Sequence, residues 1–162
     1  MAEVDSGAAA VDPIGIASDA IRLEIVIWNR VDTALRIRHQ IGLAVFEVLH
    51  FTAKAPTPGI RISELAQALG ASLGGTSRLI DRVLQTGLIS RTVDTADRRV
   101  SHVALTTAGK RKLTATSKTY TAEVAAMLDP ALTSREQHQL HTLTRRLLVA
   151  LDPQWSPGAT RP

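Results

Sequence analysis

The chain of 162 residues contains no cysteine and few aromatic residues, which make up 3% of the total. Without cysteine there can be no disulfide, no thiolate-bound zinc and no thiol oxidation switch. No apolar run approaches the roughly 20 residues that a membrane-spanning helix needs, and the N-terminus lacks the basic-then-apolar order of a secretory signal. With 44% hydrophobic and 21% charged residues, the composition favours an ordinary globular protein in the cytoplasm.

Catalytic signatures are also missing. The sequence has no nucleophile elbow, no glycine-rich phosphate loop with its Lys-Ser/Thr ending, and no His-Glu-x-x-His pair. His138 and His141 share a helix face, but no third ligand accompanies them, and zinc sites take three or four ligands. We therefore predict that the protein is not an enzyme and needs neither a cofactor nor a metal.

The positive charge of the chain is concentrated in its middle. The net charge is only +4, but residues 61–112 hold nine basic and four acidic side chains, a local excess of +5. Such an excess attracts a polyanion and makes its binding fall with salt. Taken alone, a basic cluster is more often a solvated surface. It indicates binding to a polyanion only if it coincides with a binding motif.

The N-terminal third predicts helices. Residues 1–17 are small and rich in Gly and Ala, which favours a flexible tail. A long helix is expected from about Ser18, with apolar residues around so much of its surface that more than one neighbour should bury it. Gly42 interrupts this pattern, a second helix follows over 43–52, and the prolines and glycine of 55–59 end it. We assign 18–58 to helices that support dimerisation.

The next two helices are short and close together. Ser63 is a candidate cap for the first helix and Gly70 ends it, whereas Ser72 is a candidate cap for the second, which Gly87 closes. A helix, a tight glycine-containing turn and another helix form the helix-turn-helix pattern. By the 3.6-residue period, the second helix buries one side and exposes the opposite one. We expect Leu79, Ile80, Val83 and Leu84 to be buried. We expect Ser77, Arg78, Asp81 and Arg82 to be solvent-exposed.

A β-hairpin is expected directly afterwards. Residues 88–93 and 100–105 alternate as strands do, and residues 94–97 supply turn chemistry. Thr106 can then cap a helix to about Leu128, and Ser134 a last helix with an apolar edge; the rest, 152–162, is a tail. The fold class is therefore mainly α with a small β-hairpin wing: a winged helix-turn-helix lobe over 59–108 between N- and C-terminal helices. Because the flanking helices, including 109–151, carry more apolar surface than one small domain can bury, they predict a dimer.

Several of these segments together resemble the MarR (multiple antibiotic resistance regulator) family of winged helix-turn-helix transcription regulators. The resemblance covers roughly residues 18–151, and its most specific part is the wing-to-helix signature. The matching segments are Asp97-x-Arg99-x-x-x-Val103-x-Leu105-Thr106-x-x-Gly109, Ser63-Glu-Leu-Ala66, Leu69-Gly70, Arg78-Leu79-Ile80-Asp81-Arg82 and Gly87-Leu88-Ile89-x-Arg91. One segment alone would be weak evidence, but the ordered set is specific.

The resemblance implies a homodimer that binds a pseudo-palindromic operator in double-stranded DNA. Proteins of this kind mostly repress transcription, and many are released from DNA by a small, often aromatic ligand. A second interpretation of the sequence remains: a winged helix used for protein interaction or for non-specific DNA binding, without a ligand switch.

Candidate site residues follow from the motifs and the resemblance. The first turns of a recognition helix enter the major groove, although this chain has Leu73 and Gly74 where the family often has long polar residues. An arginine in the wing suits a narrow minor groove, with a carboxylate nearby to orient it. We expect DNA contacts from Ser72 (or a capping role for it), Thr76, Ser77, Arg78 and Arg82 in the recognition helix; Asp97, Arg98 and Arg99 in the wing; and Arg61, Arg91, Lys110 and Arg111 at phosphates. A ligand pocket is expected near Trp28, His39, Phe46 and His50.

Overall fold

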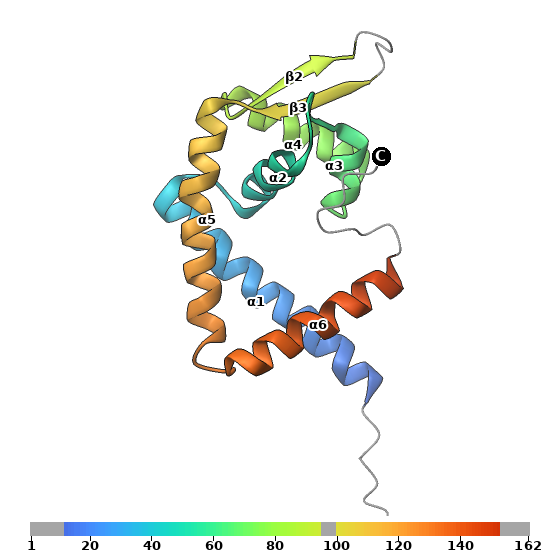
Figure 1. Cartoon of the computed structure of the whole chain (residues 1–162), viewed down its shortest axis with the longest axis vertical. Helices are drawn as coiled ribbons and strands as arrows, with labels where there is room; N and C mark the ends of the chain where they lie inside the picture. Colours follow the sequence, from blue (N-terminus) through green and yellow to red (C-terminus); the bar gives the residue numbers. More distant parts are fainter. Residues whose placement is uncertain (1–11, 95–99, 153–162) are drawn as a thin grey trace, which may run out of the picture.

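The computed structural model describes residues 12–94 and 100–152. Figure 1 shows how its helices and strands are arranged. In chain order the elements are α1 (Pro13–His39), α2 (Leu43–Lys54), β1 (Ile60–Arg61), α3 (Ile62–Ala68), α4 (Leu73–Gln85), β2 (Ile89–Val93), β3 (Ser101–Leu105), α5 (Thr107–Leu128) and α6 (Ser134–Leu151). The predicted fold class, mainly α with a small β-hairpin, is confirmed.

Helix α1 begins at Pro13, five residues before the predicted start. The Asp12 carboxylate accepts hydrogen bonds from the backbone N–H groups of Ile14 and Gly15, both at 3.0 Å. Proline fits the first helical position because its missing N–H would have no partner there. Residues 13–17, expected in the tail, are therefore helical, because a local cap outweighs their small side chains.

Two other helices begin with a different cap from the one predicted. Arg61 rather than Ser63 stands at the N-cap of α3, and its backbone N–H donates to Glu64 Oε2 at 3.0 Å. Thr133 rather than Ser134 caps α6, and its N–H donates to Glu136 Oε2 at 2.8 Å. In both cases the acid three residues after the cap fixes the start of the helix. The predicted caps Ser72 and Thr106 are confirmed.

The sheet has three antiparallel strands in the order β1–β3–β2. The expected hairpin pairs Ile89 with Leu105 at one end and Val93 with Ser101 at the other. Strand β1, which pairs Ile60 with Val103, was not expected. Its two residues are too few to show the alternation by which a strand is found in a sequence.

The hydrophobic core lies in one lobe, formed by α2, α3, α4, the sheet and the C-terminal half of α1. In Figure 1, α2 lies inside this lobe and α5 runs from it toward α6. The fully buried large side chains come from all of these elements: Val31, Leu35, Val48, Leu49, Leu65, Ile80, Val83 and Val103.

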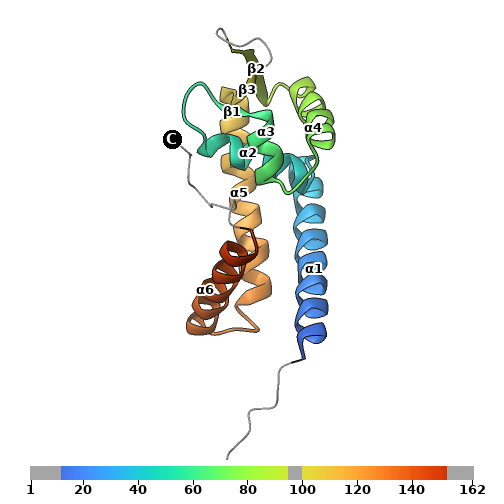
Figure 2. The ribbon, with the colours of Figure 1, turned by 90° about the vertical axis from the view of Figure 1, so that its right-hand side faces the viewer.

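Outside the lobe, apolar side chains remain exposed. In α1 only Val31 and Leu35 are buried, and in α6 no residue is. The expectation that several neighbours bury the long first helix is therefore wrong for a single chain, which supplies neighbours only to its C-terminal half. Figure 2 shows that α1 and α6, which cross in the view of Figure 1, lie on different sides of α5.

Candidate nucleic-acid interface

Helix α4 is held in the lobe by one face and exposes the other. Its buried face consists of Thr76, Ile80 and Val83, and Ser72 Oγ caps its start by accepting from the Gly75 N–H at 3.2 Å. On the exposed face, Arg78, Asp81 and Arg82 line a shallow hollow together with Gly75. Two guanidinium groups on an open helix face can bind an anionic polymer such as a nucleic acid backbone.

The structure changes one part of the predicted recognition set. Thr76 is 1% exposed, so its side chain is not available to a base edge. It lies on the same helical stripe as Ile80 and Val83, and packing against the lobe decided its orientation. Ser77 is half-buried, whereas Ser72, Arg78 and Arg82 are exposed as expected. Arg78 Nε–H also donates to the Gly74 carbonyl at 3.3 Å, which folds its side chain along the first turn of α4.

The hairpin next to α4 forms the stem of a wing. At the loop end of the hairpin the Asp94 N–H donates to the Val100 carbonyl at 2.9 Å. The expected wing contacts Asp97, Arg98 and Arg99 fall outside the described residues. They therefore stay a prediction from the sequence.

A histidine that sequence reasoning did not single out lies near the loop end of this stem, where it pairs with Thr92. His102 is buried, with its Nδ1 at 3.3 Å from the Gly59 carbonyl oxygen and its Nε2 at 3.3 Å from Asp94 Oδ2. The ring thus connects the loop before β1 to the end of β2. Gly59 has a φ of 131°, and a Cβ there would lie 2.3 Å from the Val103 carbonyl oxygen, so this loop needs glycine. No sequence pattern marks the histidine, because its partners Gly59 and Asp94 are brought to it by strand pairing and loop packing.

The wing joins α5 at a compact junction. Thr106 Oγ1 donates to the carbonyls of Gly87 (2.8 Å) and Leu88 (3.1 Å) and accepts from the Gly109 N–H at 3.0 Å. A Cβ on Gly109 would lie 1.9 Å from the Leu88 carbonyl oxygen. The Leu105-Thr106-x-x-Gly109 signature therefore has a structural reason: the threonine caps α5, and the glycine lets α5 contact the chain before β2.

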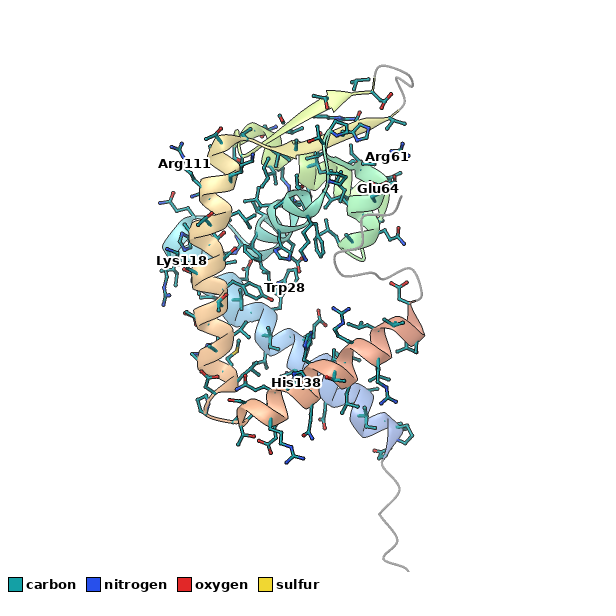
Figure 3. The ribbon with its side chains drawn as sticks, viewed as in Figure 1. Trp28, Arg61, Glu64, Arg111, Lys118 and His138 are labelled. Atoms are coloured by element: carbon teal, nitrogen blue, oxygen red, sulfur yellow. The ribbon has the colours of Figure 1, made fainter. Side chains whose placement is uncertain are left out.

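The four candidate phosphate contacts are exposed but do not form one cluster. In Figure 3, Arg111 on α5 and Arg61 at the end of β1 lie at opposite sides of the lobe. Arg91 has partners within the protein: its Nη2 donates to Ser101 Oγ at 3.2 Å, and its Nη1 lies 3.9 Å from Asp81 Oδ1. It therefore connects the wing stem to α4. Lys110 is exposed in the first turn of α5.

The four candidate pocket residues have different surroundings in the structure. Phe46 is buried and stacks on Tyr120 and His50, with ring centroids 4.9 Å and 5.7 Å apart. His39 instead shares a hydrogen bond of 2.7 Å between its Nε2 and Thr119 Oγ1. Trp28 is 37% exposed on α1. Phe46 and His50 lie one helical turn apart on α2, whereas Trp28 and His39 belong to α1.

Charged and aromatic groups around that stack have shifted pKa values. Burial raises the pKa of the Glu47 carboxyl, and the nearby Glu24 carboxylate raises it further. Burial also raises the pKa of Tyr120, with Glu47 adding to the effect. Burial lowers the pKa of His50, assisted by Lys54. Each shift favours the neutral form of its group, so this region is mainly an apolar environment.

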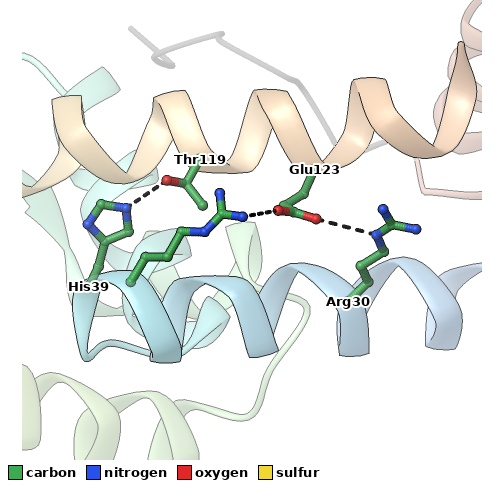
Figure 4. A network of polar contacts seen from close by, with 5 residues as sticks. Arg30, His39, Thr119 and Glu123 are labelled. Atoms are coloured by element: carbon green, nitrogen blue, oxygen red, sulfur yellow. Dashed lines mark hydrogen bonds and ion pairs between the residues drawn. The ribbon is translucent and has the colours of Figure 1, made fainter.

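A polar network fixes α1 against α5, as Figure 4 shows. Glu123 lies between two arginines of α1, with Oε2 at 3.3 Å from Arg30 Nε and Oε1 at 3.1 Å from Arg38 Nη2. Farther along, the Lys112 ammonium donates to the His39 carbonyl at 3.2 Å. These contacts set the angle at which α5 leaves the lobe.

Within residues 12–94 and 100–152, no group of three or more His, Asp or Glu side chains is placed to hold a metal ion. Among the same residues, no helix has the length and apolar character to cross a membrane.

Comparison with known proteins gives consistent results for sequence and fold. Residues 39–100 match the model of the MarR family. The transcriptional repressor MprA of Escherichia coli K12 is 34% identical over 99 residues, which are 61% of this chain and 56% of MprA. The chain thus spans only about half the length of this curated relative.

Two solved structures illustrate the shared fold. The MarR family regulator Sco3205 of Streptomyces coelicolor, solved in complex with DNA, has a TM-score of 0.77 at 21% identity over 86% of this chain and 88% of its own. CouR of Rhodococcus jostii RHA1, solved with p-coumaroyl-CoA bound, has a TM-score of 0.72 at 20% identity over 90% of this chain and 96% of its own. At these identities the likeness concerns the fold.

Proposed function

We propose that the chain is a member of the MarR family, whose model matches residues 39–100, and that it acts as a homodimeric, sequence-specific DNA-binding regulator of transcription. The observation that carries the proposal is the outer face of α4. Arg78 and Arg82 are exposed there, while Thr76, Ile80 and Val83 anchor the opposite face in the core. A rigid helix with free cations beside a hairpin suits insertion into the major groove. MprA, the relative that is 34% identical over 99 residues, is named a transcriptional repressor.

Exposed apolar surface supports the proposed dimer. Helix α6 has no buried residue, although one of its edges is lined by Leu140, Leu143, Leu147 and Leu151. The N-terminal half of α1 exposes Ile14, Ile16, Ile21 and Leu23 in the same way. An isolated helix with such an edge gains stability chiefly by burying it, and a second copy of the chain supplies matching helices. Two lobes related by a twofold axis would then contact half-sites about 10 bp apart.

The contacts in such a complex are of two kinds: contacts to base edges, which recognise the sequence, and contacts to phosphates, which position the protein on the DNA. In the proposed arrangement, Ser77, Arg78 and Arg82 face the major groove, and Ser72 lies at the helix end near the backbone. Asp97, Arg98 and Arg99 of the wing are assigned to the minor groove and its phosphates on the basis of the sequence. The exposed residues Arg61, Arg91, Lys110 and Arg111 are assigned to phosphates.

The proposal is tested by selecting bound sites from random DNA and measuring their affinity by fluorescence anisotropy. We expect a palindromic consensus, tight binding relative to random duplex, and a steep fall of affinity with salt. Arg78→Ala should relax the base preference, and Arg99→Ala should weaken binding to all sequences. Lys118→Ala, an exposed cation of α5 outside the proposed contact set, is the matched control. Failure to enrich any sequence would contradict the proposal.

We further propose that the regulator is a repressor released by a small aromatic ligand. The stack of Phe46, His50 and Tyr120 supports this part, because it lies where α2 meets α5 and offers flat apolar surfaces. The binding of p-coumaroyl-CoA by CouR, which shares the fold, also supports it. Titration of p-coumaroyl-CoA and of free phenolic acids into the operator complex should lower its anisotropy. Complexes that persist at saturating ligand would refute the release step.

One observation favours a second function, non-specific DNA binding or protein interaction. The first turn of α4 contains Leu73, Gly74 and Gly75, none of which has a side-chain hydrogen-bond donor. Base reading by hydrogen bonds is therefore restricted to the following turns. Equal affinity for the selected site and for random duplex would favour this second function.

A further inference from the structure

The first turn of α4 contains two residues that the fold itself does not require. Leu73, the first helical residue, is 56% exposed, although an apolar side chain gains nothing from solvent. A Cβ on Gly74 would have no atom within 4 Å, and its backbone is not in the left-handed region. Any residue would fit there, and alanine would favour the helix by up to about 1 kcal/mol. Gly109 differs, because a Cβ there would lie 1.9 Å from a carbonyl oxygen.

The position of these residues gives them a common role. Ser72 caps α4 at the same end, and the buried Thr76 in the next turn fixes this end to the lobe. In Figure 2, α4 lies at the outer edge of the lobe, beside the hairpin. The first turn is therefore rigid and open to solvent on the face that, in the proposed function, approaches DNA.

The chemistry of the two residues points to one feature of the major groove. Leucine has no donor or acceptor, and the apolar group that a base presents in the major groove is the C5-methyl of thymine. A glycine next to it leaves the helix backbone free to approach the base edges closely. We propose that Leu73 packs on a thymine methyl in each half-site and that Gly74 permits the approach. The proposal rests on the proposed function and specifies its sequence preference.

Replacement of thymine by deoxyuridine tests the contact, because it removes the methyl and leaves the base pairing intact. In the selected operator, each thymine of one half-site is replaced in turn, and affinity is measured by fluorescence anisotropy. We expect one replacement to weaken binding about fourfold, the effect of losing one buried methyl-sized group. Leu73→Ala should bind the normal operator about as weakly and show no further loss with deoxyuridine. Leu73→Met, which keeps an apolar contact, should restore the difference.

Two more variants complete the test. Ile37→Ala removes another exposed apolar side chain, from α1, and should keep the wild-type response to deoxyuridine. Gly74→Ala should leave thermal stability unchanged or higher while lowering affinity for the operator. A gain in stability with unchanged affinity would refute the role of Gly74.

The outcomes separate the inference from the function on which it rests. If the protein selects a defined sequence but no deoxyuridine affects wild type and Leu73→Ala differently, the methyl contact is refuted and the regulator remains. If no sequence is selected at all, the proposed function fails, and the inference fails with it.

Discussion

Substitution of Gly109 by alanine should destabilise the fold strongly, because α5 contacts the chain before β2 at this residue. The added Cβ would lie 1.9 Å from the Leu88 carbonyl oxygen, whereas ordinary van der Waals contact begins at 3.4 Å. Helix and strand must therefore separate by about 1.5 Å. The first turn of an α-helix cannot bend by that amount, so the displacement extends into the junction.

The magnitude follows from what this separation breaks. The Leu88 carbonyl accepts from the Thr106 N–H and from Thr106 Oγ1, both at 3.1 Å, and neither bond survives a shift of that size. Each lost bond costs about 1 kcal/mol, and forced overpacking costs roughly 1–3 kcal/mol. The helix propensity of alanine returns at most about 1 kcal/mol. The free energy of unfolding should thus fall by roughly 2–4 kcal/mol, a large part of the 5–15 kcal/mol typical of a domain.

Urea unfolding followed by circular dichroism, at one fixed protein concentration, measures this loss. Gly74→Ala is the matched control, since Gly74 also lies in the first turn of a helix but its Cβ would meet no atom within 4 Å. Its midpoint should equal or exceed that of the wild type. If Gly109→Ala and Gly74→Ala unfold at the same urea concentration, the close contact does not control the junction.

Three further predictions concern other parts of the chain. If the proposed dimer forms through α6, Leu143→Lys combined with Leu147→Lys should yield a monomer in size-exclusion chromatography with light scattering, because both side chains lie on the exposed apolar edge of α6. Thr142→Lys is the control, and a double variant that stays dimeric would place the interface elsewhere. Glu123→Gln should lower the free energy of unfolding by about 1 kcal/mol or less at low salt, since its two arginine partners are half-exposed. This difference should shrink in high salt, and a difference that salt does not change would argue against an ionic origin. Glu47→Gln should stabilise the fold at neutral pH, because the raised pKa of Glu47 means that the folded state binds its proton more tightly than the unfolded state. The stability of the wild type therefore falls as pH rises above the unfolded pKa. At acidic pH, where Glu47 is protonated in both states, the advantage of the variant should disappear. An equal advantage at both pH values would show that ionisation is not the cause.

Much of the lobe was predictable because its signals are local. Ser72 and Thr106 are caps in the sequence and in the structure, since a cap depends on backbone groups two or three residues away. The two hairpin strands were expected from alternation within two short runs, and the structure pairs them from Ile89–Leu105 to Val93–Ser101. The starts of α1 and α3 differ from the predicted ones, although the contacts that fix them are local. Asp12 accepts from the N–H groups of Ile14 and Gly15, and Glu64 accepts from the Arg61 N–H.

The candidate site was predictable only in outline. Arg78 and Arg82 were expected on the outer face of α4 because the helical period alone places them opposite Ile80 and Val83. Thr76 was misplaced, since its polar side chain suggested exposure while its position on the stripe led into the core. His102 and its partners were missed, because Gly59 lies 43 residues away in the chain.

By itself the sequence determined the order of the helices and of the two hairpin strands, the segment that carries positive charge, and the resemblance to the MarR family. These properties depend on spacing and on neighbouring residues. The tertiary structure decided which groups meet: Gly109 with the Leu88 carbonyl, His102 with Gly59 and Asp94, and Glu123 with two arginines of α1. It also decided which apolar faces remain without a neighbour. Such contacts depend on the packing of distant segments, and close packing allows few alternative arrangements once the lobe has formed.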